Sequence, residues 1–277
     1  MSLKTIRIFT DDLVAFLNHP GRETTMAATS LSRCSRFWLA LLVSFCITVG
    51  ISAPLIHLVD RFLVRLRFSS SMDVTQDFFL LIVLGVMVAP LLEELVFRYP
   101  LKLVKPRYLK LAVYFSSIVF GLVHAINYEN SEPLFYALLP IIVSSQALGG
   151  LILAYLRLRD GVLWSMFAHG LFNAAIALLS LLFLQNRMAL DEKEDHYHLT
   201  VKEYAFKNGK QKTHIHRNGR RIDSIMWRQG SLQSLVDSLH GNGLYADKLL
   251  VDVDLKTSRP LSADSVLALL KKQYRIE

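Results

Sequence analysis

The sequence predicts an all-α, polytopic membrane helix bundle of about five to six spans, followed by a small soluble α+β domain. Of its 277 residues, 52% are hydrophobic and only 19% are charged, which is more apolar than a soluble chain of this size needs. Long apolar runs continue to Leu184, and beyond it charges are dense and such runs vanish. We therefore divide the chain into residues 1–36, 37–184 and 185–277.

The first segment, residues 1–36, is polar to amphipathic. Thr10, Asp11 and Asp12 precede a short apolar pattern that stops at residues 18–21. This arrangement predicts a short capped helix, which we expect to lie on the membrane surface.

Five apolar runs follow, each close to the ~20 residues that a bilayer requires. They cover residues 37–59, 78–97, 108–126, 134–158 and 161–184. Cys34 and Cys46, at the start of the first run and inside it, fit neither a disulfide framework nor zinc-ligand spacing. We interpret them as small buried residues.

The loop cations predict an orientation. Lys and Arg are concentrated at residues 4–36, 98–110 and 157–159, and only the cations at 61–67 oppose them. The positive-inside rule then places the N-terminus in the cytoplasm and the tail across the membrane, most simply the bacterial inner membrane. The net charge of +8 fits this signal and contact with anionic headgroups. We expect membrane lipid as a partner and no nucleic acid, because no Gly-rich or aromatic–basic binding motif is present.

Residues 185–277 predict a small α+β domain. Asn-Gly turns at 208–209 and 218–219 separate β-prone stretches, which predicts a three-stranded meander. The predicted elements are strands at about 196–207, 210–217 and 220–228, a helix at 231–240, a strand at 248–255, and a last helix capped by Ser262. Two His-x-His pairs, at 196–198 and 214–216, could hold a metal, but no Cys or well-spaced carboxylate accompanies them. We interpret them as surface histidines, and the domain as a module that binds a protein partner.

Charged residues inside the second run mark a candidate site. Glu93, Glu94 and Arg98 follow an uncharged stretch from Phe78. A charge at bilayer depth costs at least about 2.5–3.5 kcal/mol, so it needs a partner, a water-filled cavity or a function. Glu94 and Arg98 stand four apart and can pair on one helix face, whereas Glu93 points about 100° away. Glu93 is therefore predicted to be the free carboxylate, available for proton transfer.

Other spans carry a few polar residues of the same kind. His124 lies near the end of the third span, and His169 and Asn173 share a face of the fifth. Small residues such as Gly121, Gly150 and Gly170 on these spans allow close helix approach, so the polar groups can converge.

Such a set supports hydrolysis without a covalent intermediate. A carboxylate and a His can deprotonate water, while a second His and an Asn amide stabilise the oxyanion. No serine stands in a Gly-x-Ser-x-Gly motif. A lone His or Asn in a membrane span more often joins helices, and a Glu–Arg pair can be a plain buried salt bridge. Six such residues on three spans favour a site.

Three motifs then resemble a known family. Glu-Glu-x-x-x-Arg at 93–98, Phe-x-x-x-His at 120–124 and His-x-x-x-Asn at 169–173 look like the signature of the CPBP intramembrane glutamic endopeptidases. That family includes type II CAAX prenyl proteases and the bacteriocin-processing, Abi-like self-immunity proteins. The resemblance covers about residues 78–184.

This resemblance implies a glutamate-type protease acting on a membrane-associated or lipidated peptide, without a cofactor. It implies that Glu93 and His124 activate water, and that Glu94 and Arg98 orient and charge-balance the site. It also implies an oxyanion hole formed by His169 and Asn173.

Two alternatives stay open. Two His and two Glu could serve a metal-dependent membrane hydrolase, although the chain lacks His-Glu-x-x-His and offers Asn173 where a stronger ligand would be expected. The chain could also be a non-catalytic membrane scaffold whose residues 185–277 bind a partner. We favour the peptidase, with no metal.

Overall fold

The computed structural model describes residues 2–21, 31–69 and 76–277. Two compact units divide the chain. The helical unit comprises Met1–Ser69 and Ile82–Ala175, and the sheet unit comprises Ser70–Leu81 and Ile176–Glu277. Part of the predicted N-terminal segment, including Arg22, lies outside the described residues.

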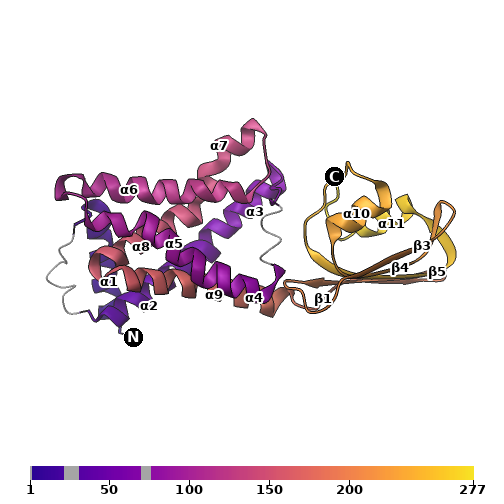
Figure 1. Cartoon of the computed structure of the whole chain (residues 1–277), viewed down its shortest axis with the longest axis horizontal. Coiled ribbons are helices and arrows are strands. Elements are labelled where there is room, and N and C mark those ends of the chain that lie inside the picture. Colours follow the sequence, from indigo (N-terminus) through magenta and orange to yellow (C-terminus); the bar gives the residue numbers. More distant parts are fainter. Residues whose placement is uncertain (1, 22–30, 70–75) are drawn as a thin grey trace. The chain divides into compact units, whose positions relative to one another are not determined.

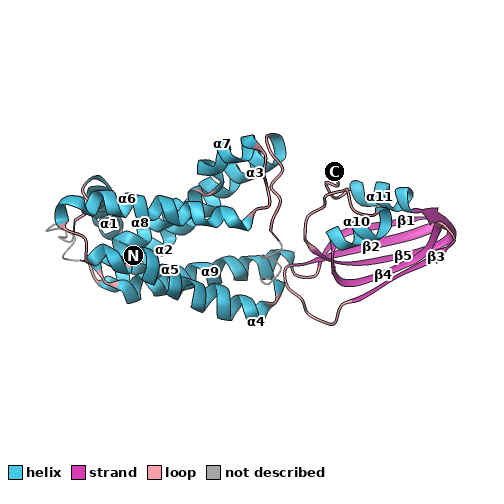
Figure 2. Cartoon of the chain, turned by 45° about the horizontal axis from the view of Figure 1, so that its top comes forward, coloured by secondary structure: helices cyan, strands magenta, loops and turns pink. Residues whose placement is uncertain are grey.

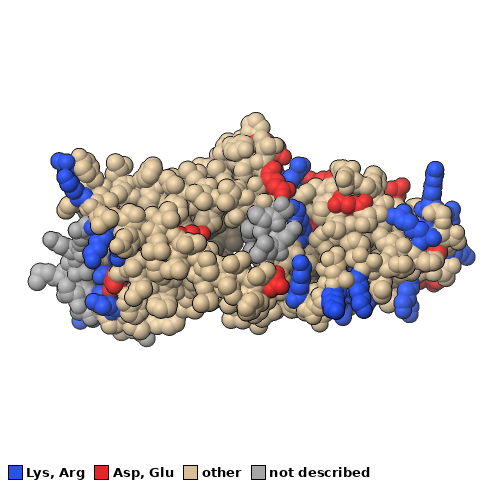
Figure 3. All heavy atoms as spheres, in the orientation of Figure 1, with Lys and Arg blue, Asp and Glu red and all other residues tan. Residues whose placement is uncertain are grey.

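Among the described residues, five helical stretches are long and apolar enough to cross a membrane, which confirms the predicted spans (Figure 1). They are Arg33–Phe62, Phe78–Lys102, Pro106–Asn127, Pro133–Arg159 and Val162–Leu184. In the view of Figure 3, Lys and Arg gather at one end of the helical unit and its middle carries few charged atoms. The chain is therefore an integral membrane protein with a helical bundle.

Two of these spans contain a π-helical segment, and each segment directly precedes a helix that carries proline in its first turn. The first span consists of α2 (Arg33–Ile47), π-helical residues Thr48–Ser52 and α3 (Ala53–Phe62). The second consists of α4 (Phe78–Leu80), π-helical residues Leu81–Val88 and α5 (Ala89–Phe97). Pro54 and Pro90 lack the backbone N–H that would bond four residues back, so the helix shifts its hydrogen-bond register at these points.

The remaining helices of the unit complete the bundle. They are α1 (Leu3–Asn18), α6 (Pro106–Val123), α7 (Pro133–Ile142), α8 (Ser144–Arg159) and α9 (Val162–Leu184), which runs into the sheet unit. Helix α7 contains Pro140 and is followed directly by α8, so the fourth span is two consecutive helices.

Helix α1 differs from the prediction. It begins at Leu3, where Ser2 caps it by accepting a hydrogen bond from the backbone N–H of Thr5. Its apolar face, including Phe9 and Phe16, is buried, and both rings contact Tyr155 of α8 edge-on. This face therefore packs on protein and not on lipid, and the location of the helix at the membrane surface stays a prediction.

A buried acid explains this docking. Asp12 is fully buried, accepts a hydrogen bond from the Tyr155 hydroxyl at 2.8 Å, and pairs with Arg159 at 3.2 Å. Nearby, Arg36 pairs with Asp160 at 2.6 Å. Because buried ions need close partners, these pairs fix α1 and the start of α2 to the end of α8.

The two cysteines also differ from the prediction. Cys34 and Cys46 are both free and exposed, not buried. A membrane helix turns apolar and small residues outward as readily as inward, so apolar character did not predict burial here.

The sheet unit has one five-stranded antiparallel sheet in the order β1-β2-β5-β4-β3. Its strands are β1 (Arg187–Glu194), β2 (Tyr197–Tyr204), β3 (Lys212–Asn218), β4 (Arg221–Ser231) and β5 (Leu250–Ser262). Helices α10 (Leu232–His240) and α11 (Ala263–Lys271) cover the same face of the sheet (Figures 1 and 2). This confirms the predicted α+β domain.

The predicted meander is wrong. Strand β5 lies between β2 and β4, so β2 is not a neighbour of β3. Alternate residues of β5, Val251, Val253 and Leu255, point to one face of the sheet and are fully buried in its core, as is typical of a central strand. Only the turn at Asn218 forms the predicted hairpin, with Gly219 at φ +62°. Strand β1 was not predicted, because this edge strand is rich in charge and half exposed.

Polar contacts hold the sheet unit together. Glu203 is buried and accepts hydrogen bonds from Arg187 and from the Tyr274 hydroxyl at 2.8 and 3.0 Å. Burial raises the pKa of Tyr274, and the Glu203 carboxylate raises it further. His214 and His216 are exposed, and in the described residues no group of three or more His, Cys, Asp or Glu could hold a metal ion.

The docking of α1 gives a first prediction. Asp12→Ala leaves the buried Arg159 without this carboxylate and should lower the unfolding free energy by about 3–5 kcal/mol. Denaturant unfolding of the purified protein in detergent would measure it. Asp11→Ala is the matched control, because Asp11 is exposed and its ion pair with Arg7 should contribute less than about 1 kcal/mol. Equal losses from the two variants would contradict the assignment.

Candidate active site

The backbone before the two glutamates is shaped by Pro90. The π-helical residues Leu81–Val88 precede it, and their carbonyl groups approach α9 closely. The Asn173 amide donates a hydrogen bond to the Gly85 carbonyl at 2.8 Å. A Cβ at Gly170 would lie 2.6 Å from the Val86 carbonyl oxygen, so only glycine allows this approach.

Glu94 and Arg98 form the buried part of the site. Both side chains are fully buried, and Arg98 Nε lies 3.6 Å from Glu94 Oε1. The Arg98 guanidinium also stands over the face of Phe120, 3.8 Å from the ring centroid. Among the described residues, its three nitrogens have no hydrogen-bond partner within normal distance.

His169 lies between the two glutamates. Its Nδ1 is 3.3 Å from Glu94 Oε1, and its Nε2 is 3.5 Å from Glu93 Oε2. The Glu94 side chain is fully buried, whereas that of Glu93 is 30% exposed. One carboxylate is therefore enclosed by charged partners, and the other faces an accessible space.

The ring of His124 packs edge-on against the ring of Phe120. The His124 Nδ1 is 2.7 Å from the Phe120 carbonyl oxygen, which can only accept a hydrogen bond, so Nδ1 carries a proton, and in the neutral ring the lone pair is on Nε2. The Phe120 ring contacts both His124 and His169. In the described part of the chain, no ion pair or hydrogen bond joins His124 to Glu93 directly.

Two contributing residues were not predicted from the sequence. The hydroxyl of Ser165, on α9, is hydrogen-bonded to Glu94 Oε2. The guanidinium of Arg157, on α8, donates to the backbone carbonyl of Arg98 at 3.2 Å. Ser165 stands four residues before His169 and so shares its helix face, which was a usable signal. Arg157 instead resembled an ordinary loop cation.

The arrangement is suited to proton transfer. It combines two carboxylates, an imidazole within reach of both, and a guanidinium that balances charge in a buried space. A second imidazole offers an unoccupied lone pair nearby. Such a set can accept a proton from water and hold it, and its N–H groups can stabilise an oxyanion.

Close packing beside Arg98 gives the second prediction. A Cβ at Gly150 would lie 2.8 Å from Arg98 Nη2, whereas nothing lies within 4 Å of a Cβ at Gly149. Gly150→Ala should displace the guanidinium and lower any hydrolytic turnover at this site about 10- to 100-fold, because small displacements of site groups are costly. Gly149→Ala should leave turnover and thermal stability unchanged. Similar turnover of the two variants would contradict this account of the site.

Comparison with known proteins identifies one matching family. No curated protein and no solved structure matches the chain. The model of the type II CAAX prenyl endopeptidase Rce1-like family matches residues 75–175. This range contains α5 with both glutamates, His124, and the part of α9 that carries His169 and Asn173. The match agrees with the family predicted from the three motifs: residues 75–175 are similar to the type II CAAX prenyl endopeptidase Rce1-like family.

Proposed function

We propose that this protein is an intramembrane endopeptidase that hydrolyses a peptide bond of a membrane-associated or lipidated peptide. Its nucleophile is a water activated by Glu93 and His124. The observation that carries the proposal is the asymmetry of the glutamates, since Glu94 is fully buried beside Arg98 and Glu93 is 30% exposed. A charge-balanced set of this kind in a membrane-spanning bundle is costly to maintain, which favours a functional role.

Glu93 and His124 share the role of base. Both side chains are partly exposed, and no hydrogen bond or ion pair joins them directly among the described residues. We propose that one water lies between them and contacts both. The Glu93 carboxylate and the lone pair on His124 Nε2 are both acceptors for the protons of such a water. Hydroxide then attacks the substrate carbonyl without a covalent enzyme intermediate. As the tetrahedral intermediate collapses and the C–N bond breaks, the proton that the base took from water passes to the leaving amine.

His169 and Asn173 provide the oxyanion hole. His169 Nε2 lies 3.5 Å from Glu93 Oε2, so a proton on this nitrogen is placed beside the base and can be donated to the oxyanion of the tetrahedral intermediate. The Asn173 amide has two N–H groups, one of which is engaged by the Gly85 carbonyl. The second remains for the oxyanion. Buried Arg98 balances the charge of Glu94 throughout.

The substrate class follows from the surroundings of the site. The helices that carry it are apolar on their outer faces, so a hydrophobic or lipid-modified peptide reaches it from the bilayer. The matching family model is named for CAAX prenyl endopeptidases. A peptide with a C-terminal Cys-aliphatic-aliphatic-X sequence is therefore the first substrate to test, in farnesylated and unmodified forms.

The third prediction concerns the base. Glu93→Gln and His124→Gln should each lower cleavage of an internally quenched peptide of this class at least about 100-fold, because general-base catalysis contributes 10²–10⁴-fold. Turnover by purified protein in liposomes is the measurement. The matched control is His57→Gln, since His57 is an exposed histidine of α3 away from these contacts.

The turnover of each variant is interpreted only together with a check that the variant folds. Each variant should elute and melt like the wild-type protein, so that lost turnover reflects chemistry. If Glu93→Gln and His124→Gln both retained wild-type turnover, the proposed base would be wrong.

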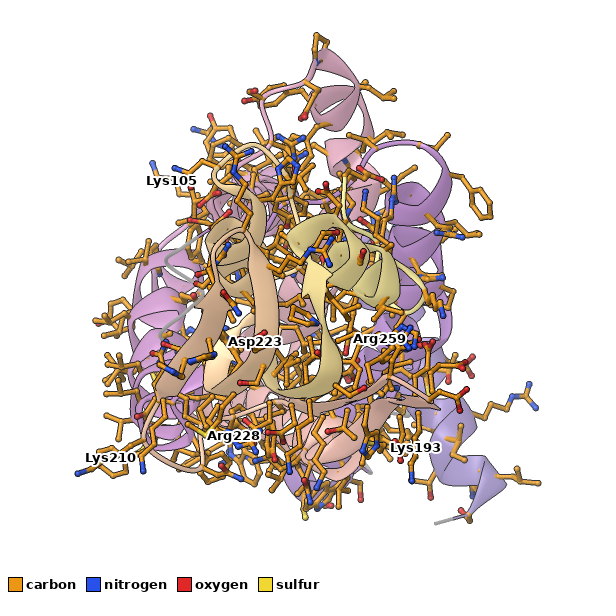
Figure 4. All side chains as sticks on the ribbon, turned by 90° about the vertical axis from the view of Figure 1, so that its right-hand side faces the viewer. Lys105, Lys193, Lys210, Asp223, Arg228 and Arg259 are labelled. Atoms are coloured by element: carbon orange, nitrogen blue, oxygen red, sulfur yellow. The ribbon has the colours of Figure 1, made fainter. Side chains whose placement is uncertain are left out.

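We also propose that the N-terminus lies in the cytoplasm and the sheet unit lies beyond a bacterial inner membrane, as the loop cations and five spans favour. The fourth prediction uses Cys34 as an internal marker, since it is exposed at the cytoplasmic end of α2. Lys210 is exposed and projects outward from the sheet unit (Figure 4). In Cys46→Ser protein, an impermeant maleimide should label Lys210→Cys in intact spheroplasts and Cys34 only after permeabilisation. The reverse pattern would overturn this topology.

A further inference from the structure

Ser165 is a buried polar residue at the centre of the helical unit that none of the three motifs includes. It lies on α9, one turn before His169, and is fully buried. A serine hydroxyl in such a place needs hydrogen-bond partners, because leaving it unsatisfied costs the full free energy of removing it from water.

The hydroxyl joins three helices. It is hydrogen-bonded to Glu94 Oε2 on α5 and lies 3.1 Å from the backbone carbonyl of Leu153 on α8. The other oxygen of Glu94, Oε1, faces Arg98 and His169. We propose that Ser165 is a positioning residue of the active site, which fixes the rotation of the Glu94 carboxylate and, through it, the orientation of the His169 ring.

The two acceptors make a hydroxyl especially suitable here. Serine has one proton and two lone pairs, so it donates to only one acceptor at a time. When Glu94 is ionised, the hydroxyl donates to it. When Glu94 carries a proton, its carboxyl donates to Ser165, and the hydroxyl turns to the Leu153 carbonyl. Ser165 therefore holds Glu94 in place in either charge state.

Arg98 supplies the competing interaction. Its nitrogens lack hydrogen-bond partners among the described residues, and a guanidinium binds a carboxylate best through two parallel bonds. Without the Ser165 hydroxyl, both Glu94 oxygens can rotate toward Arg98. His169 Nδ1 then loses its acceptor, and the ring is no longer held with Nε2 against Glu93. The charged groups around Glu94 are Glu93, Arg98, His169 and Arg157.

This inference rests on the proposed peptidase function, and the fifth prediction tests it by a matched pair of variants. Ser165→Thr keeps the hydroxyl, and Ser165→Val introduces a side chain of nearly the same shape as threonine but without the hydroxyl. Cleavage of the farnesylated, internally quenched peptide should show kcat lowered about 10- to 100-fold in Ser165→Val and Ser165→Ala, with KM within about twofold of wild type. Ser165→Thr should recover most of the kcat of wild type.

Ser117→Ala is the control for simple loss of a buried hydroxyl. Ser117 is 2% exposed on α6, and in the described part of the chain its hydroxyl bonds only the Val113 carbonyl of its own helix. It should lose little kcat. If Ser165→Thr were no better than Ser165→Val, or if Ser117→Ala lost as much kcat as Ser165→Ala, Ser165 would be a packing residue and the inference would be overturned.

A second measurement does not depend on turnover. Nitrogen-15 NMR of ring-labelled histidine, with the His169 signal assigned by its loss in His169→Gln, should show changed ring shifts in Ser165→Val and wild-type shifts in Ser165→Thr. If the wild-type protein cleaved no peptide, the proposed function would be wrong. The NMR comparison of Ser165→Val with Ser165→Thr would still show whether Ser165 orients the His169 ring. Unchanged shifts in both variants would overturn the inference even in an active enzyme.

Discussion

The buried ion pair of Glu94 and Arg98 is the interaction on which the rest of the helical unit depends. Both side chains are fully buried in a bundle whose surroundings are hydrocarbon. Removing two such charges from water costs several kcal/mol each, and their mutual attraction offsets this only with good additional contacts. The surrounding residues supply those contacts: the face of Phe120 lies under the guanidinium, and Ser165 and His169 bond the carboxylate.

Backbone geometry brings these contacts within reach. Pro90 displaces the helix register just before the glutamates, and the π-helical turn that results directs carbonyl groups toward α9. Asn173 bonds one of these carbonyls, and Gly170 leaves space for the next. Gly150 likewise lets α8 approach Arg98. The position of each charged group thus depends on a residue with no charge of its own.

The sequence was most informative where a residue is energetically unfavourable in its surroundings, such as a charged side chain within an apolar run. Glu93, Glu94 and Arg98 were recognisable because charges are rare in apolar runs, and five spans were recognisable by length alone. Ser165 was missed because a serine in a membrane helix is common and only its partner on α5 distinguishes it. The predicted order of the strands was wrong for a different reason. Turn signals predict local hairpins, whereas the central place of β5 depends on strands far apart in the chain.

The unequal settings of the two glutamates explain why a hydrolase of this type would need both. Two adjacent carboxylates on one helix cannot both face the same small space without repelling each other, and a base must stay accessible to water while its charge is balanced. Because Glu94 is buried against Arg98, its charge is balanced and it repels Glu93 less. Glu94 also gives the His169 ring a fixed acceptor on one side. The opposite nitrogen of that ring is then directed at Glu93. In the proposed mechanism Glu94 therefore has a positioning role, and Glu93, whose side chain is partly exposed, accepts the proton from water.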